Sequence, residues 1–161
     1  MTTKSEYSEQ EWESLLQTPV LAGSYIIVAD ISVTAVPREL KGLYKAIVAQ
    51  DAPTASQELV AAVVADLLQR AENKEKLEQI PYKESKDPRP QMLESLRQSL
   101  SILAEKGSPG EKDGFCTWLL NVAEATAEAG REGGFLGIGS VRVSEQEQAA
   151  LDELKHAFGL A

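Results

Sequence analysis

The sequence predicts an all-α protein, a bundle of about six or seven helices that forms a single domain over residues 1–161. Apolar residues recur three and four positions apart through most of the chain, which is the spacing of one helix face. Proline and glycine clusters separate these segments at short intervals. Only the stretch 25–28, Tyr-Ile-Ile-Val, has the composition of a strand, and no second strand is available to pair with it.

The first helix is expected to begin at Ser8. Ser8 and Glu11 have the spacing of a capping box, in which each side chain accepts a hydrogen bond from the backbone N–H of the other residue. Tyr7 before the cap and Trp12 inside the helix have the spacing of a hydrophobic staple. Pro19 then ends this helix or opens the next one, because proline lacks the N–H that a helix interior requires.

The segment Val20–Ile31 is apolar on every side, so we predict a central helix that its neighbours bury. Asp30 lies near the end of this helix. Its carboxylate either faces solvent or caps the helix, or it is an acidic ligand. The uncharged run Leu15–Ala29 is shorter than the roughly 20 apolar residues that a membrane-spanning helix needs, so we expect no integral membrane segment.

Two further helices are expected before Pro81. The first begins near Pro37, and the second opens with Thr54–Gln57, which has the spacing of another capping box. The second helix carries a double apolar row that continues more weakly to Leu77. The apolar positions are Leu40, Leu43, Tyr44, Ile47 and Val48 in the first helix, and Leu59, Val60, Val63, Val64, Leu67 and Leu68 in the second.

The segment Ile80–Pro90 is the best candidate for a connection between two packed halves of the domain. Its three prolines and five charged residues favour an exposed linker over a recognition segment for a proline-reading domain. Three helical patterns follow it. Their apolar positions are Leu93, Leu96, Leu100 and Leu103; Phe115, Trp118, Leu119, Val122 and Ala123; and Leu151, Leu154 and Phe158.

A glycine-rich apolar loop, Gly130–Glu147, precedes the last of these helices. Its glycines allow the chain to reverse sharply, so we expect Phe135, Leu136 and Ile138 to return to the core. The alternative is an exposed apolar tip, with Arg142 beside it. The glycine spacing matches neither a P-loop nor a dinucleotide-binding motif, and the loop lacks the acidic ligands of an EF-hand.

Composition excludes several classes of function. The chain has 16 basic and 25 acidic residues and a net charge of −9, which argues against nucleic acid as the main partner. Cys116 is the only cysteine, which excludes an internal disulfide and a multi-thiolate metal site. We expect it to be buried as a small apolar residue rather than exposed as a reactive thiol. His156 is the only histidine, which excludes His-rich zinc sites.

No catalytic motif and no cofactor-binding motif is found, so we expect neither enzymatic activity nor a bound cofactor. The segment Met1–Gln10 is polar and lacks the charged-then-apolar pattern of a signal peptide. We therefore expect a soluble, cytoplasmic protein.

Two stretches resemble a known group of proteins. The segment 129–147, Ala-Gly-Arg-Glu-Gly-Gly-Phe-Leu-Gly-Ile-Gly-Ser-Val-Arg-Val-Ser-Glu-Gln-Glu, and the segment 11–23 resemble the closing and opening motifs of a group of small bacterial all-helical proteins of uncharacterised function. The segment 139–147 also resembles the turn before a helix in TerB-type tellurite-resistance domains. This second resemblance implies an acidic, metal-associated site, for which Asp30, Glu145 and Glu147 are the candidates.

Three hypotheses about function follow. The first is a non-catalytic module that binds a protein partner or a second copy of itself, with Phe135, Leu136, Ile138 and Arg142 as candidate contact residues. The second is a TerB-like, acidic stress-response or metal-associated module. The third is a peripheral membrane-contacting protein that inserts the apolar tip of the glycine loop, although a net negative charge opposes binding to anionic lipid.

Overall fold

The computed structural model describes residues 2–29, 36–75, 87–132 and 145–160, without the side chains of 36–42 and 129–132. Within these ranges the chain forms six α-helices and two short 3₁₀ turns, and no strand. The predicted all-α class is therefore confirmed. The elements in order are η1 (Lys4–Glu6), α1 (Glu9–Ala29), α2 (Val36–Ala49), η2 (Thr54–Ser56), α3 (Gln57–Glu72), α4 (Arg89–Lys106), α5 (Pro109–Glu132) and α6 (Glu145–Ala157).

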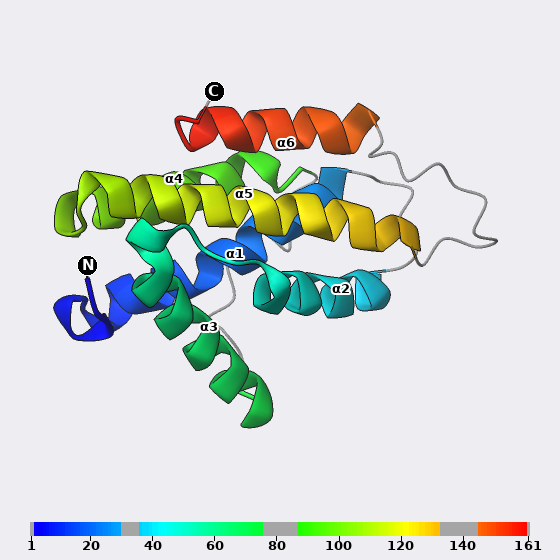
Figure 1. The fold of residues 1–161 in the computed structure, drawn as a ribbon. Coiled ribbons are helices and arrows are strands. Elements are labelled where there is room, and N and C mark those ends of the chain that lie inside the picture. Colours follow the sequence, from blue (N-terminus) through cyan, green and yellow to red (C-terminus); the bar gives the residue numbers. More distant parts are fainter. Residues whose placement is uncertain (1, 30–35, 76–86, 133–144, 161) are drawn as a thin grey trace.

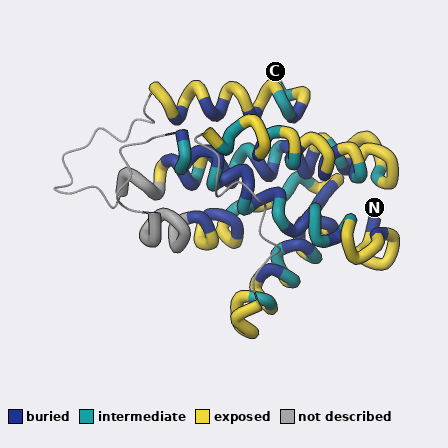
Figure 2. Tube along the Cα trace, turned by 180° about the vertical axis from the view of Figure 1, so that it is seen from behind, coloured by how far each residue is buried: buried dark blue, intermediate teal, exposed yellow. Residues whose placement is uncertain are grey.

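Two long helices, α1 and α5, form the centre of the bundle (Figure 1). Helices α4 and α6 pack on one side of this pair and α2 packs on the other, while α3 crosses the beginning of α1 and projects away from the body. Figure 2 shows the same arrangement by burial, with buried residues along the central helices and an exposed outer end of α3. Among the described residues, no helix is both long enough and apolar enough to cross a membrane.

The predicted buried central helix is the second half of α1. Leu21, Tyr25 and Ile26 are each at most 2% exposed there. α5 shares the central position, because its apolar face is fully buried at Phe115, Trp118, Leu119, Val122 and Ala123. One continuous core joins residues from α1 through α6, so helices before and after the segment 76–86 bury the same apolar surface.

Pro19 does not separate two helices, contrary to the sequence prediction. α1 runs without interruption from Glu9 to Ala29 with Pro19 inside it. A proline at this position cannot donate to the carbonyl of Leu15, four residues earlier. The hydroxyl of Thr18 donates to that carbonyl oxygen instead, at 2.7 Å, and both Thr18 and Leu15 are fully buried. The Leu15 carbonyl, which Pro19 leaves without a backbone donor, is therefore satisfied by the side chain of the neighbouring residue, Thr18.

The first predicted cap is confirmed. The backbone N–H of Ser8 donates to Glu11 Oε2 at 2.8 Å, and the N–H of Glu11 donates to Ser8 Oγ at 3.2 Å. The rings of Tyr7 and Trp12 lie 5.9 Å apart between centroids, as the staple requires.

The second predicted capping box, Thr54–Gln57, does not form. Residues 54–56 form the turn η2, and α3 begins at Gln57 without a side-chain cap. Ser56 is fully buried, and its hydroxyl donates to the carbonyl of Pro53 at 3.2 Å. The 3₁₀ turn forms in place of the cap because η2 packs closely against α5. Gly114 of α5 permits this approach, since a Cβ at that position would lie 2.7 Å from Ser56 Oγ.

α3 is shorter and less buried than its apolar pattern predicts. It ends at Glu72, and Lys74 adopts a left-handed conformation with φ of 55°, so the helix does not continue toward Leu77. Leu59, Val60, Val63 and Leu67 are buried. Leu68, in the second predicted row, is 43% exposed although the adjacent Leu67 is 3% exposed, so only one face of α3 packs on the bundle there.

Candidate functional site

Most of the site residues predicted from sequence fall outside the described part of the chain. Phe135, Leu136, Ile138 and Arg142 of the glycine loop lie there, and so does Asp30. The two remaining candidates, Glu145 and Glu147, lie in the first turn of α6. Glu145 is exposed, whereas Glu147 is 6% exposed. Within the described ranges, no three His, Cys, Asp or Glu side chains are grouped closely enough to hold a metal ion.

Cys116 is fully buried in α5, as predicted. Burial raises the pKa of its thiol to about 11. The reactive thiolate is therefore almost absent at neutral pH. This cysteine contributes packing rather than chemistry.

The most developed polar arrangement lies at the beginning of the chain, where η1 and α1 meet α3. The indole N–H of Trp12 donates to Asp66 Oδ2 of α3 at 2.6 Å. Lys4 of η1 forms an ion pair with the same oxygen at 2.8 Å, and its ammonium lies 5.8 Å from the centroid of the Trp12 ring. Burial on its own raises the pKa of Asp66, but the hydrogen bonds from Lys4 and Trp12 outweigh it and hold that pKa below its ordinary value of 3.8.

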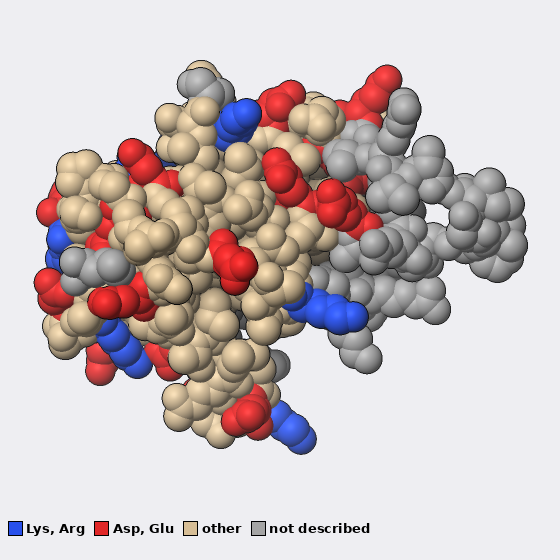
Figure 3. All heavy atoms as spheres, in the orientation of Figure 1, with Lys and Arg blue, Asp and Glu red and all other residues tan. Residues whose placement is uncertain are grey.

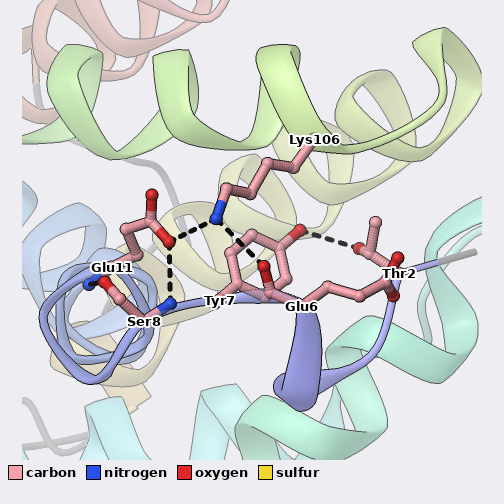
Figure 4. A network of polar contacts seen from close by, with 6 residues as sticks. All are labelled: Thr2, Glu6, Tyr7, Ser8, Glu11 and Lys106. Carbon is pink, nitrogen blue, oxygen red and sulfur yellow. Dashed lines mark hydrogen bonds and ion pairs between the residues drawn. The ribbon is translucent and has the colours of Figure 1, made fainter.

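A second lysine repeats this arrangement from the other side. Lys106 of α4 forms an ion pair with Glu11 at 2.5 Å, and its ammonium lies 5.4 Å from the centroid of the Tyr7 ring. It also donates to the backbone carbonyl of Glu6 at 2.9 Å. Figure 4 shows Lys106 reaching down from α4 to these acceptors. Each aromatic ring of the staple is thus covered by a lysine that is paired with a nearby carboxylate.

A fully buried carboxylate anchors the segment before η1. Glu111, in the first turn of α5, accepts a hydrogen bond from the backbone N–H of Thr2 at 2.7 Å and another from its hydroxyl at 2.5 Å. The Thr2 hydroxyl is also hydrogen-bonded to Tyr7 at 2.7 Å. A buried carboxylate must be hydrogen-bonded to be tolerated, so these bonds fix the position of η1.

A hollow of about 540 Å³ opens beside these residues. We call it the N-terminal hollow. Residues of η1 and the first turns of α1 line one wall, and Arg70 of α3 lines the other. Arg70 pairs with Glu13 across the hollow at 2.6 Å. Its lining residues are Lys4, Tyr7, Ser8, Glu9, Gln10, Trp12, Glu13 and Arg70. Figure 3 shows acidic and basic side chains intermixed at this end of the molecule, while the middle of the same face is largely uncharged.

A second, smaller hollow of about 290 Å³ lies where α4 and α6 meet α1. The hydroxyl of Tyr25, a residue that is 1% exposed, donates to Glu153 of α6. Burial, together with this bond to a carboxylate, raises the pKa of Tyr25. Arg89 and Asp87 also line this hollow and pair with each other at 3.0 Å. The bond from Tyr25 to Glu153 ties α6 to the central helix, which gives it a structural role.

Three large apolar side chains are exposed among the described residues. Tyr44 and Val48 lie one turn apart on α2, at 36% and 53% exposure, and Leu68 lies on α3. The sequence pattern assigned all three to buried faces. Among the described side chains of α2, which begin at Leu43, those of Leu43, Ala46 and Ile47 are buried.

No known protein family, curated protein or solved structure matches the chain.

Sequence reasoning placed three of the residues that line the N-terminal hollow, Tyr7, Ser8 and Trp12. The capping box and the staple predicted the positions of Tyr7, Glu11 and Trp12. It missed Asp66 and Lys106, which lie 54 and 95 residues from their partners in the chain. One signal was available, because a buried tryptophan N–H usually finds an acceptor. The sequence could not say which carboxylate supplies it.

Proposed function

We propose that the protein is a non-catalytic module that binds a protein partner through the N-terminal hollow. The observation that carries the proposal is the lining of this hollow, which combines tryptophan, tyrosine and arginine with the two carboxylates of Glu9 and Glu13. Tryptophan, tyrosine and arginine are the residues that contribute most to binding energy at protein interfaces. The proposal places the module in the cytoplasm, as the sequence predicts.

The position of the hollow supports this proposal. It lies between α1, which is part of the core, and α3, whose outer end projects from the bundle (Figure 1). A partner that enters the hollow would contact both a rigid wall and a protruding helix.

Site-specific photo-cross-linking tests the proposal. A photoreactive residue at Gln10, which lines the hollow, is compared with one at Glu124, an exposed position on α5. In cells that express the protein, we expect a discrete cross-linked protein from position 10 that mass spectrometry identifies as one partner or as a second copy of the chain. Position 124 should not give it. The same products from both positions, or none from position 10, would contradict the proposal.

A further inference from the structure

The two lysines over the aromatic rings differ in how firmly the fold holds them. Lys106 belongs to α4, has a side chain that is 33% exposed, and donates to both Glu11 and the backbone of Glu6. Lys4 belongs to the three-residue turn η1, and its side chain is 59% exposed. Its ammonium holds a single ion pair, with Asp66. Lys4 is therefore the lysine that another cation could replace at low cost, since exposed ion pairs contribute little free energy.

The fold holds Asp66 and Trp12, the two partners of Lys4, more firmly than it holds Lys4. Asp66 has a side chain that is only 15% exposed, and the Trp12 indole holds its carboxylate in position. The ring of Trp12 lies beneath the ammonium, and tryptophan is the aromatic side chain that attracts cations most strongly. A carboxylate fixed by a donor, next to the face of a tryptophan, is a binding site for one ammonium or guanidinium group.

The charges around the hollow favour the same chemistry. Glu9 lines the hollow and forms no ion pair within the described part of the chain. Arg70 is already neutralised by Glu13. With Lys4 displaced, Glu9 in the lining and Asp66, which the lining residue Trp12 holds beside the hollow, leave this region negative, and the whole chain carries a net charge of −9. A carboxylate or phosphate ligand would be repelled here, whereas a basic side chain would be attracted.

We propose that the N-terminal hollow binds a lysine or arginine side chain of a protein partner, and that Lys4 occupies this site in the free protein as an internal competitor. The inference rests on the proposed function and adds the chemistry of the partner. The incoming cation takes the place of Lys4 between Asp66 and the Trp12 ring. Displaced Lys4 returns to solvent, to which most of its side chain is already exposed.

The test measures binding of a short dye-labelled peptide that carries two lysines between neutral residues, by fluorescence anisotropy. The same peptide with arginine, with acetyl-lysine or with glutamine in place of lysine provides the other arms, and free lysine separates a protein partner from a small amine. We expect the lysine and arginine peptides to bind, the acetyl-lysine and glutamine peptides to bind at least tenfold more weakly, and added salt to weaken binding.

Two variants separate competition by Lys4 from the general effect of charge. Lys4→Ala should strengthen peptide binding by roughly three- to tenfold, since it removes a competing cation. Lys155→Ala, on the exposed side of α6, removes the same charge far from the hollow and should change binding by less than about twofold. Lys4→Gln is a further variant at the same position, because it keeps a long polar side chain on η1 while removing the charge, and it should strengthen binding as Lys4→Ala does. Asp66→Asn should abolish binding in either background.

Equal effects of Lys4→Ala and Lys155→Ala, or equal binding of the lysine and glutamine peptides, would overturn the inference. Cross-linking at position 10 distinguishes this failure from failure of the proposed function. If a partner cross-links there but no basic peptide binds, the proposed interaction module is retained and the recognition of a basic side chain is rejected. If no partner cross-links at position 10 and no basic peptide binds, both proposals are rejected.

Discussion

The continuity of α1 through Pro19 makes a quantitative prediction about Thr18. Thr18→Val keeps the shape of the side chain but removes the hydroxyl that donates to the Leu15 carbonyl. In the presence of Pro19 this leaves a fully buried acceptor without a donor, which costs about 1–3 kcal/mol. In a Pro19→Ala background, the N–H of the new alanine can donate to the same carbonyl, as in a regular helix. The cost of Thr18→Val should then fall below about 1 kcal/mol.

Urea unfolding followed by far-ultraviolet circular dichroism measures all four proteins of this double-mutant cycle. Thr126→Val is a matched control. Its hydroxyl is also buried and donates to the carbonyl of Val122 at 2.7 Å. That carbonyl lies four residues earlier in α5, so the backbone N–H of Thr126 still serves it after the substitution. If Thr18→Val cost the same free energy with proline and with alanine at position 19, the proposed role of its hydroxyl would be wrong.

Three further predictions follow from the packing and the charges. Gly114→Ala should destabilise the protein by about 1–3 kcal/mol, because the new Cβ would lie 2.7 Å from Ser56 Oγ, whereas Gly110→Ala meets only Ala55 at 3.6 Å and should change the melting temperature little. Equal thermal melts for these two variants would show that α5 and η2 do not approach as described. Cys116 should react with a thiol reagent only as fast as the protein unfolds, and rapid labelling of the native protein would contradict its burial. Asp66 has a lowered pKa in the folded state, so its stabilising effect is complete above the ordinary aspartate pKa and is lost as the pH falls through the lowered value. Asp66→Asn should therefore make the free energy of unfolding depend less steeply on pH below about pH 4. A pH dependence identical to that of the parent protein would refute this.

The parts of the fold that sequence predicted correctly depend on neighbours in the chain. The cap at Ser8 and Glu11 and the staple of Tyr7 and Trp12 join residues within five positions of one another, so local spacing determines them. The helical class and the buried second half of α1 follow from the density of apolar residues.

The errors arise where a distant segment decides the local structure. Pro19 reads as a helix end until Thr18 is seen to satisfy the carbonyl of Leu15. Thr54 and Gln57 have the spacing of a capping box, but Ser56 packs against Gly114 of α5 and a 3₁₀ turn forms instead. These contacts depend on how helices pack, which one-dimensional spacing does not contain.

The candidate site shows the same division. Trp12 and Glu11 could be placed from the sequence, yet their partners Asp66 and Lys106 come from other helices. The apolar pattern also placed Tyr44 and Leu68 in the core, because a wide apolar row does not show how much of it the neighbouring helices cover.

The central claim is that the Trp12–Asp66 pair is a binding site for a basic side chain. The chain has two tryptophans, so a ¹H–¹⁵N spectrum contains two indole signals. The Trp12 N–H donates to Asp66, whereas the fully buried Trp118 N–H has no partner within the described ranges, which provides an internal control. On titration with the lysine peptide, the account predicts that the Trp12 signal moves, that Lys4→Ala lowers the peptide concentration needed, and that the Trp118 signal stays in place. A Trp12 signal that does not move, while the signals of residues elsewhere do, would contradict the account.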